Sequence, residues 1–162
     1  VHVVQVSDAG ASLIFTPKNT IANVGDFVQF QFWPKNHSVV QSAFDSPCVP
    51  LQNVQPNATQ AFFSGFMPVT VDSTETPTYT IQVHDMKPIW YYCSQAMHCQ
   101  NGMVGAINAP LTGEKTIEKY TELAGGAPQN LSPGHNAPGG NYSVSVPSPS
   151  ASPIDTTLLT SA

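Results

Sequence analysis

Eleven residues in the second half of the chain, Cys93 to Met103, limit what the protein can fold into more than any other segment does. Their sequence, Cys-Ser-Gln-Ala-Met-His-Cys-Gln-Asn-Gly-Met, sets a thiol, an imidazole and a thioether at Cys-x4-His-x4-Met spacing. The apolar residues Ile-Trp-Tyr-Tyr come directly before them and predict a buried strand. The fold must therefore place Cys93 at a strand end, with His98 and Met103 on the loop that turns out of that strand.

These three side chains are soft or borderline metal ligands. Thiolate, thioether and imidazole together suit copper in both of its oxidation states, whereas a structural zinc site uses four strong ligands and no thioether. Two imidazoles and a thiolate in a trigonal plane, with a long axial methionine, form a type 1 (blue) copper site. The loop supplies three of these four ligands, so one more histidine must come from elsewhere. We predict one type 1 copper ion bound by His37, Cys93, His98 and Met103.

His37 is the candidate for the remote ligand because it follows a predicted strand that ends at Trp33. The remaining histidines are less suitable. His2 lies near the start of the chain, His84 lies in a predicted exposed turn, and His135 lies in a Gly/Pro-rich segment.

Two other residues near the site have alternative roles. Met97 is a rival thioether, but it directly precedes His98, and both side chains could hardly reach one small ion. Met103 is therefore the preferred axial ligand. We also expect the backbone N–H of Ser38 to donate to the sulfur of Cys93, a contact that would tune the reduction potential.

The three cysteines leave one unpaired thiol if the other two form a disulfide. If Cys93 binds the metal, Cys48 and Cys99 can pair, close a loop of about 50 residues and stabilise the fold by ~4 kcal/mol. That bond would tether the ligand loop and hold the ligands rigidly. The alternative bond, between Cys93 and Cys99, would destroy the site and stays open for misfolded metal-free protein.

Low charge, with 15 Pro and 11 Gly, favours a loop-rich β protein over a helical one. Short apolar or alternating runs separated by turn residues predict a two-sheet, all-β sandwich. The predicted strands are Val1–Val6, Leu13–Phe15, Phe27–Phe32, His37–Gln41, Gln60–Phe63, Thr78–Val83, Ile89–Tyr92 and Val104–Asn108, with a loop over residues 44–60.

The composition changes near residue 109. Residues 112–124 carry apolar side chains at positions 117, 120 and 124, which predicts one short amphipathic helix capped by Thr112. From residue 126 the chain is rich in Pro, Gly, Ser and Asn and predicts an extended tail that cannot bury a core. The expected organisation is a domain over 1–108, an appended helix over 109–125 and a tail over 126–162.

Charge and sequons bear on location and partners. A net charge of −5, with five Lys and Arg and no basic run, argues against nucleic-acid binding. No stretch reaches membrane-spanning length, and the chain opens on a predicted strand, so we expect any targeting segment to have been removed. Four sequons favour a secretory route. The glycosylation candidates are Asn57, Asn130, Asn141 and Asn36, the last being the least suitable if His37 is buried against a metal.

The spacing Cys93-x4-His98-Cys99-x2-Gly102-Met103, with a histidine and a cysteine upstream, resembles the phytocyanin-like cupredoxins. The runs His-Ser-Val, Phe-Asp-Ser-Pro-Cys, Trp-Tyr-Tyr-Cys-Ser-Gln and His-Cys-Gln-Asn-Gly-Met are similar to the cupredoxin domain of fungal extracellular Ser-rich proteins, many of which are predicted to be GPI-anchored. The resemblance covers residues 1–108. It implies a Greek-key β-sandwich, one type 1 copper and no substrate chemistry of its own. Ser38, where plant phytocyanins usually have Asn, is a departure from the pattern.

The resulting hypothesis is a secreted, monomeric blue-copper protein that carries single electrons and is not an enzyme. Its redox partner would be a protein or a small-molecule reductant, and the tail could anchor it to the cell surface. Copper storage or delivery, or a non-redox role in the cell wall, is the alternative. A multicopper oxidase is disfavoured because the chain has no His-x-His motif. A histidine-brace monooxygenase is disfavoured because the brace needs an N-terminal histidine, whose free amine helps to bind the metal, and His2 is the second residue.

Overall fold

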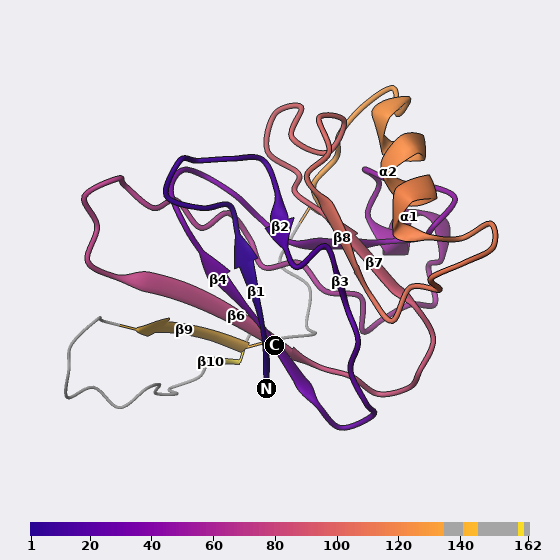
Figure 1. The fold of residues 1–162 in the computed structure, drawn as a ribbon, viewed down its shortest axis with the longest axis horizontal. Helices are drawn as coiled ribbons and strands as arrows, with labels where there is room; N and C mark the ends of the chain where they lie inside the picture. Colours follow the sequence, from indigo (N-terminus) through magenta and orange to yellow (C-terminus); the bar gives the residue numbers. More distant parts are fainter. Residues whose placement is uncertain (135–140, 146–158, 161–162) are drawn as a thin grey trace.

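The computed structural model describes residues 1–134, 141–145 and 159–160, which form two β-sheets packed face to face with one helix outside them (Figure 1). The first sheet has the order β10-β9-β6-β4-β1-β2 and the second has the order β3-β8-β7-β5. The strands of the first sheet are β1 (His2–Val6), β2 (Phe15–Thr16), β4 (Phe27–Phe32), β6 (Thr76–Gln82), β9 (Asn141–Ser145) and β10 (Leu159–Thr160). Those of the second are β3 (Asn19–Thr20), β5 (Val40–Ser42), β7 (Ile89–Tyr92) and β8 (Val104–Ile107).

Both sheets are mixed. The pairs β1–β4 and β3–β8 are parallel, and the other pairs are antiparallel. The chain passes between the sheets several times, because β3, β5 and the β7–β8 hairpin alternate with strands of the first sheet. The predicted all-β sandwich is confirmed.

The main core lies between the sheets. Buried and more exposed side chains alternate along the strands, and the buried ones form this core. In β4, Val28, Phe30 and Phe32 are buried, while the residues between them are not. The ring of Tyr91 from β7 meets Phe30 edge-on at 5.1 Å and Phe15 at 4.9 Å between ring centroids. Burial of such aromatic side chains contributes ~2 to 3 kcal/mol each to stability, so this cluster fixes the spacing of the two sheets.

Gly105 of β8 faces Tyr91 across the β7–β8 hairpin. A Cβ atom at position 105 would lie 2.6 Å from two ring carbons and the hydroxyl oxygen of Tyr91, whose ring is also packed against Phe15 and Phe30. We therefore expect Gly105→Ala to lower the free energy of unfolding by about 3 kcal/mol, measured by urea denaturation of the metal-free protein. Gly134→Ala is the control because open space surrounds that position. Equal denaturation midpoints for the two variants would contradict the prediction.

The helix outside the sandwich is α2 (Ile117–Gly125), and it begins later than the sequence predicts. Thr116, not Thr112, is the N-cap, and its side-chain oxygen accepts from the backbone N–H of Lys119 at 3.2 Å. Gly113 has φ +95°, which is not a helical conformation, so residues 112–115 cannot be part of the helix. The predicted apolar positions 117, 120 and 124 are the buried ones.

Helix α2 covers the outer face of the four-stranded sheet (Figure 1). The ring of Tyr120 stacks 4.9 Å from Trp90 of β7, and its hydroxyl bonds to that of Ser42 in β5. This face forms a second apolar cluster with the helix residues Ile117 and Ala124. The four-stranded sheet is therefore buried on both faces.

Three local expectations differ from the structure. The predicted loop over 44–60 contains one helical turn, α1 (Leu51–Val54). The predicted strand Gln60–Phe63 is reduced to a single bridge between Phe63 and Val40, and the N–H of Phe62 donates to the side chain of Gln41 instead of to a neighbouring backbone. The two-residue strand β3 was not predicted, since two residues carry no periodicity.

The chain beyond α2 also has more structure than its composition predicts. Residues 127–132 contact the β7–β8 loop, and β9 pairs antiparallel with β6 at the edge of the first sheet. Residues 135–140, 146–158 and 161–162, which include His135 and most of the Ser/Pro-rich stretch, lie outside the described residues. In the part of the chain that the structure describes, no helix has the length and apolar character needed to cross a membrane.

Candidate metal centre

Four strand ends place the predicted ligands at one end of the sandwich. His37 lies in the connection between β4 and β5, and Cys93 directly follows β7. His98 lies on the loop between β7 and β8, and Met103 directly precedes β8. Because β4 and β7 end where β5 and β8 begin, residues far apart in the sequence meet at this end.

The ligand loop is closed by its own backbone. The N–H of Cys93 donates to the carbonyl of Met103 at 3.1 Å, and the N–H of Met103 donates to the carbonyl of His98 at 2.9 Å. Gly102 has φ +103°, a conformation that favours glycine, and its N–H donates to the carbonyl of Cys99 at 3.0 Å. This turn brings Met103 back beside Cys93.

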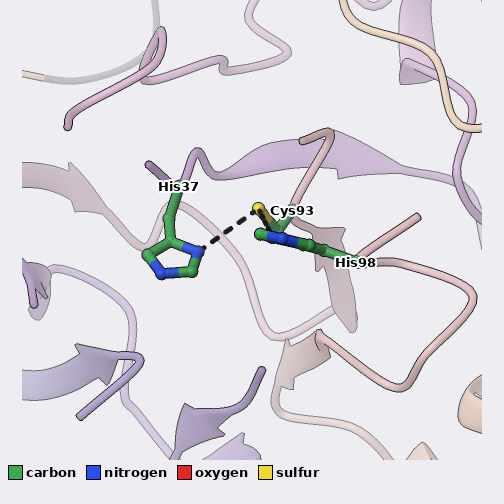
Figure 2. A group of neighbouring side chains, drawn as sticks. All are labelled: His37, Cys93 and His98. Atoms are coloured by element: carbon green, nitrogen blue, oxygen red, sulfur yellow. Dashed lines mark hydrogen bonds between the residues drawn. The ribbon is translucent and has the colours of Figure 1, made fainter. Parts of the chain in front are cut away.

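Two imidazole rings lie on either side of the Cys93 sulfur (Figure 2). Its Sγ is 3.4 Å from Nδ1 of His98 and 3.9 Å from Nδ1 of His37. The three potential ligand atoms all lie within 4.8 Å of one another. A trigonal site with metal–nitrogen and metal–sulfur bonds of about 2.1 and 2.3 Å requires N···S separations of about 3.8 Å. The three side chains therefore fit a copper ion with little rearrangement.

The orientation of His37 is fixed by its second ring nitrogen. In the tautomer that carries its proton on Nε2, this nitrogen donates to the carbonyl of Pro34 at 3.2 Å. In the other tautomer the same nitrogen accepts from the backbone N–H of Lys35 at 3.3 Å, so the ring is held in either case. In the tautomer protonated on Nε2, the lone pair of Nδ1 is free and faces the Cys93 sulfur, which is the arrangement typical of a metal-binding histidine.

Burial also sets the protonation states of the three groups. Burial lowers the pKa of His37. The hydrogen bond to Pro34 raises this pKa in part, and the neighbouring His98 lowers it. Burial likewise lowers the pKa of His98 and raises the pKa of the Cys93 thiol, against backbone hydrogen bonds that lower it. Both imidazoles are thus neutral near pH 7, and the thiol keeps its proton until a metal displaces it.

The Cys93 sulfur receives the predicted backbone hydrogen bond. The N–H of Ser38 lies 3.4 Å from Sγ, which confirms that prediction. The hydroxyl of Ser38 accepts from the backbone N–H of Ser94 at 3.0 Å and contacts its hydroxyl at 2.8 Å. A donor to the sulfur stabilises the thiolate, and this pair of serines holds that donor in place.

The two rival methionines lie in different environments. Met103 is fully buried in the same apolar cluster as Cys93, whereas Met97 is 56% exposed. The environment therefore favours Met103 as the thioether nearest the site. Of the alternative histidines, the two within the described residues do not join the cluster: His2 bonds to Asp26 at 2.9 Å, and His84 is exposed.

Cys48 and Cys99 form a disulfide that spans 51 residues, and Cys93 is the free, buried cysteine. The predicted pairing is confirmed. Both disulfide residues are fully buried in the cluster under α2. Since Cys99 directly follows His98, the bond fixes the ligand loop to the segment that precedes α1.

The sequons lie in unlike surroundings. Asn57 is exposed, whereas Asn36 is half-buried and its side-chain oxygen is covered. The side chain of Asn130 contacts the backbone of the ligand loop. Sequence reasoning treated Asn130 only as a sequon and missed this contact, which no periodicity or spacing could have revealed.

The two-layer sandwich carries the His–Cys–His cluster at one end. The chain is homologous to two proteins of the fungus Arthroderma benhamiae (strain ATCC MYA-4681 / CBS 112371). One, an "extracellular serine-rich protein", is 37% identical over 132 residues, covering 82% of this chain and 48% of the relative. The other, a "probable GPI-anchored cupredoxin-1", is 35% identical over 133 residues, covering 82% of this chain and 63% of the relative. The predicted resemblance to fungal extracellular cupredoxins is confirmed.

The chain spans about half to two thirds of the length of these relatives. No family model matches it. Among solved structures, a mutant fern plastocyanin aligns with 17% identity and a TM-score of 0.47 over 65% of this chain and 96% of that one. Pseudoazurin from Hyphomicrobium denitrificans aligns with the same identity and TM-score over 76% of this chain and 96% of the pseudoazurin chain. The chain is thus similar in sequence to fungal proteins that are named as extracellular and as a GPI-anchored cupredoxin.

Proposed function

We propose that the protein is a mononuclear type 1 copper protein that carries single electrons. His37, Cys93 and His98 would bind copper in the trigonal plane, and Met103 would bind axially. Copper in such a site cycles between Cu(I) and Cu(II). The observation that carries the proposal is the convergence of two neutral imidazoles on one buried thiol that already has a backbone N–H donor.

The unequal burial of the two histidines supports a redox role. His37 is 1% exposed, whereas His98 is half-buried at the end of the sandwich. The edge of the His98 ring therefore offers the contact for a redox partner, either a protein or a small-molecule reductant. The buried residues that surround the ligands exclude water and keep the ligand atoms at nearly fixed separations, which suits electron transfer.

The direct test is the spectrum of the copper-loaded protein. Adding Cu(II) to the metal-free chain is expected to produce an intense visible thiolate-to-copper band and the EPR signal of a type 1 centre. One equivalent should saturate both. A protein that remains colourless under these conditions does not carry this site.

Copper delivery is the rival role, and the burial of the site disfavours it. Cys93 and Met103 are fully buried, and the disulfide next to His98 restrains the loop that would have to open. We therefore expect Cu(I) release to a competing chelator to be slow relative to electron exchange with an inorganic oxidant. Release faster than exchange would favour delivery.

The two methionines provide a test of the axial ligand. Met103→Leu is expected to raise the reduction potential by at least about 60 mV, a tenfold change in the one-electron equilibrium, because a weak donor to Cu(II) is lost. Met97→Leu should leave the potential unchanged, since that side chain is mostly exposed. Voltammetry of both variants gives the comparison, and a larger shift for Met97→Leu would identify it as the axial ligand.

We further propose that the protein is secreted, monomeric and without substrate chemistry of its own. The names of the relatives, the disulfide and the exposed sequon at Asn57 support secretion. One relative's name supports anchoring at the cell surface through the tail. The proposed organisation is the cupredoxin domain over 1–108, the helical region over 109–125 and the tail over 126–162. Glycan analysis of the secreted chain tests Asn57 as an acceptor.

A further inference from the structure

The segment that follows α2, residues 127–132, crosses the outside of the ligand loop, and we call it the strap. Its first residue, Ala127, accepts from the side chain of Gln100 at 3.4 Å. Leu131 donates its N–H to the carbonyl of Cys48 at 2.9 Å and accepts from the hydroxyl of Tyr92 at 2.6 Å. The strap is thus fixed to β7 and to the disulfide, which are two rigid parts of the fold.

Asn130 points from the strap into the ligand loop. Its Nδ2 lies 3.0 Å from the carbonyl of Cys93 and 3.0 Å from the carbonyl of Ala96, with the carbonyl of Gln95 at 3.5 Å. Carbonyl oxygens only accept, so this side of the carboxamide must be the NH2 group. Both of its N–H donors are therefore used, one on each side of the turn that leads from Cys93 toward His98.

Ser132 makes a second connection from the strap to the site. Its hydroxyl donates to the hydroxyl of Ser94 at 2.7 Å. The hydroxyl of Ser94 in turn contacts that of Ser38, whose backbone N–H points to the sulfur of Cys93. Two hydrogen bonds thus link the strap, through Ser94, to the side chain of Ser38, the residue whose backbone N–H faces the thiol.

We propose that Asn130 is a positioning residue that holds the copper-ligand loop in its binding geometry, with Ser132 as its partner. The copper part of this inference rests on the proposed function. The loop that Asn130 holds is present in the chain without metal, so its effect can be measured separately.

The same contacts bear on whether Asn130 can be glycosylated. Asn130 and Ser132 are the first and third residues of Asn-Leu-Ser, and glycosylation would replace one N–H of Nδ2 by a sugar. A glycosylated Asn130 could not donate to both carbonyls, and its sugar would have to fit against the loop. Positioning of the loop and glycosylation of Asn130 therefore exclude one another.

The test compares Asn130→Asp with Asn57→Asp. Both changes remove a sequon and add one negative charge, but only the first removes donors from the loop, at nearly constant shape. In the full chain, with and without copper, Asn130→Asp is expected to speed amide hydrogen exchange at His98, Gly102 and Met103 about tenfold. In the copper-loaded protein it should also change the EPR hyperfine splitting. Asn57→Asp should change neither.

Equal exchange rates and EPR spectra for the two variants would overturn the proposal. If Asn130→Asp does not fold, the wild-type chain still provides a test by mass spectrometry of protein secreted from a eukaryotic host. Copper-loaded protein should carry an unmodified Asn130, and a glycan there with an unchanged ligand loop would overturn the proposal. A wild-type chain that never forms a type 1 centre contradicts the proposed function, whereas the exchange rates without copper test the strap independently.

Discussion

Replacing Cys93 by serine is expected to abolish the visible absorption of the copper-loaded protein completely. The band arises from charge transfer between thiolate and copper, and Cys93 is the free cysteine of the chain. A hydroxyl at this position is a much weaker copper ligand, so Cu(II) should bind loosely with an ordinary EPR signal. Absorption and EPR spectra after addition of one equivalent of Cu(II) provide the measurement.

The fold of this variant should remain intact. The serine hydroxyl can still accept from the N–H of Ser38, so the metal-free variant should lose no more than about 1 kcal/mol of stability. Circular dichroism and urea denaturation of the metal-free protein check that the loss of colour is not a loss of structure. A blue Cys93→Ser protein would show that the sulfur ligand lies elsewhere.

Removing the disulfide is expected to have the largest effect on stability. For a separation of 51 residues, the chain-entropy model gives a loss of about 4 kcal/mol in the double variant Cys48→Ala/Cys99→Ala. That is a large fraction of the stability of a domain this size. Denaturant unfolding of the metal-free protein measures it. The ligand atoms should still assemble, since neither cysteine belongs to the metal cluster.

The single variant Cys48→Ala is the informative comparison. It leaves Cys93 and Cys99 as two free thiols in one loop, and a bond between them would consume the metal-binding thiol. We therefore expect a smaller fraction of this variant to take up copper than of the double variant. A stability loss below about 1 kcal/mol in the double variant would contradict the assigned role of the disulfide.

The sequence predicted the ligand loop and the core strands better than the segments that follow the sandwich. Cys93, His98 and Met103 share a short loop, and their residue types are rare enough for spacing alone to indicate copper. The alternation in Phe27–Phe32 predicted a strand whose buried face matches the structure. These signals are local and chemically specific, which is why they could be interpreted without a structure.

The helix start and the strap could not be predicted for two different reasons. Thr112 and Thr116 are equally good caps by residue type, and the choice depends on the backbone conformation of Gly113. Residues 127–132 have the composition of a linker, and their order comes from polar contacts with a distant loop. Composition records whether a segment can bury apolar surface, but not whether another segment supplies its hydrogen-bond partners.

The outer face of the four-stranded sheet bears on how short a functional version of this chain can be. A protein ending at residue 108, the end of the proposed cupredoxin domain, would expose Trp90 and the rest of the cluster that Tyr120 covers. It would also leave the carbonyls around Cys93 without Asn130. We expect such a truncated protein to aggregate, and one ending at residue 134 to remain soluble. The minimal copper-binding unit would then extend about 27 residues past Ile107, the end of the last strand of the hairpin that carries the ligands.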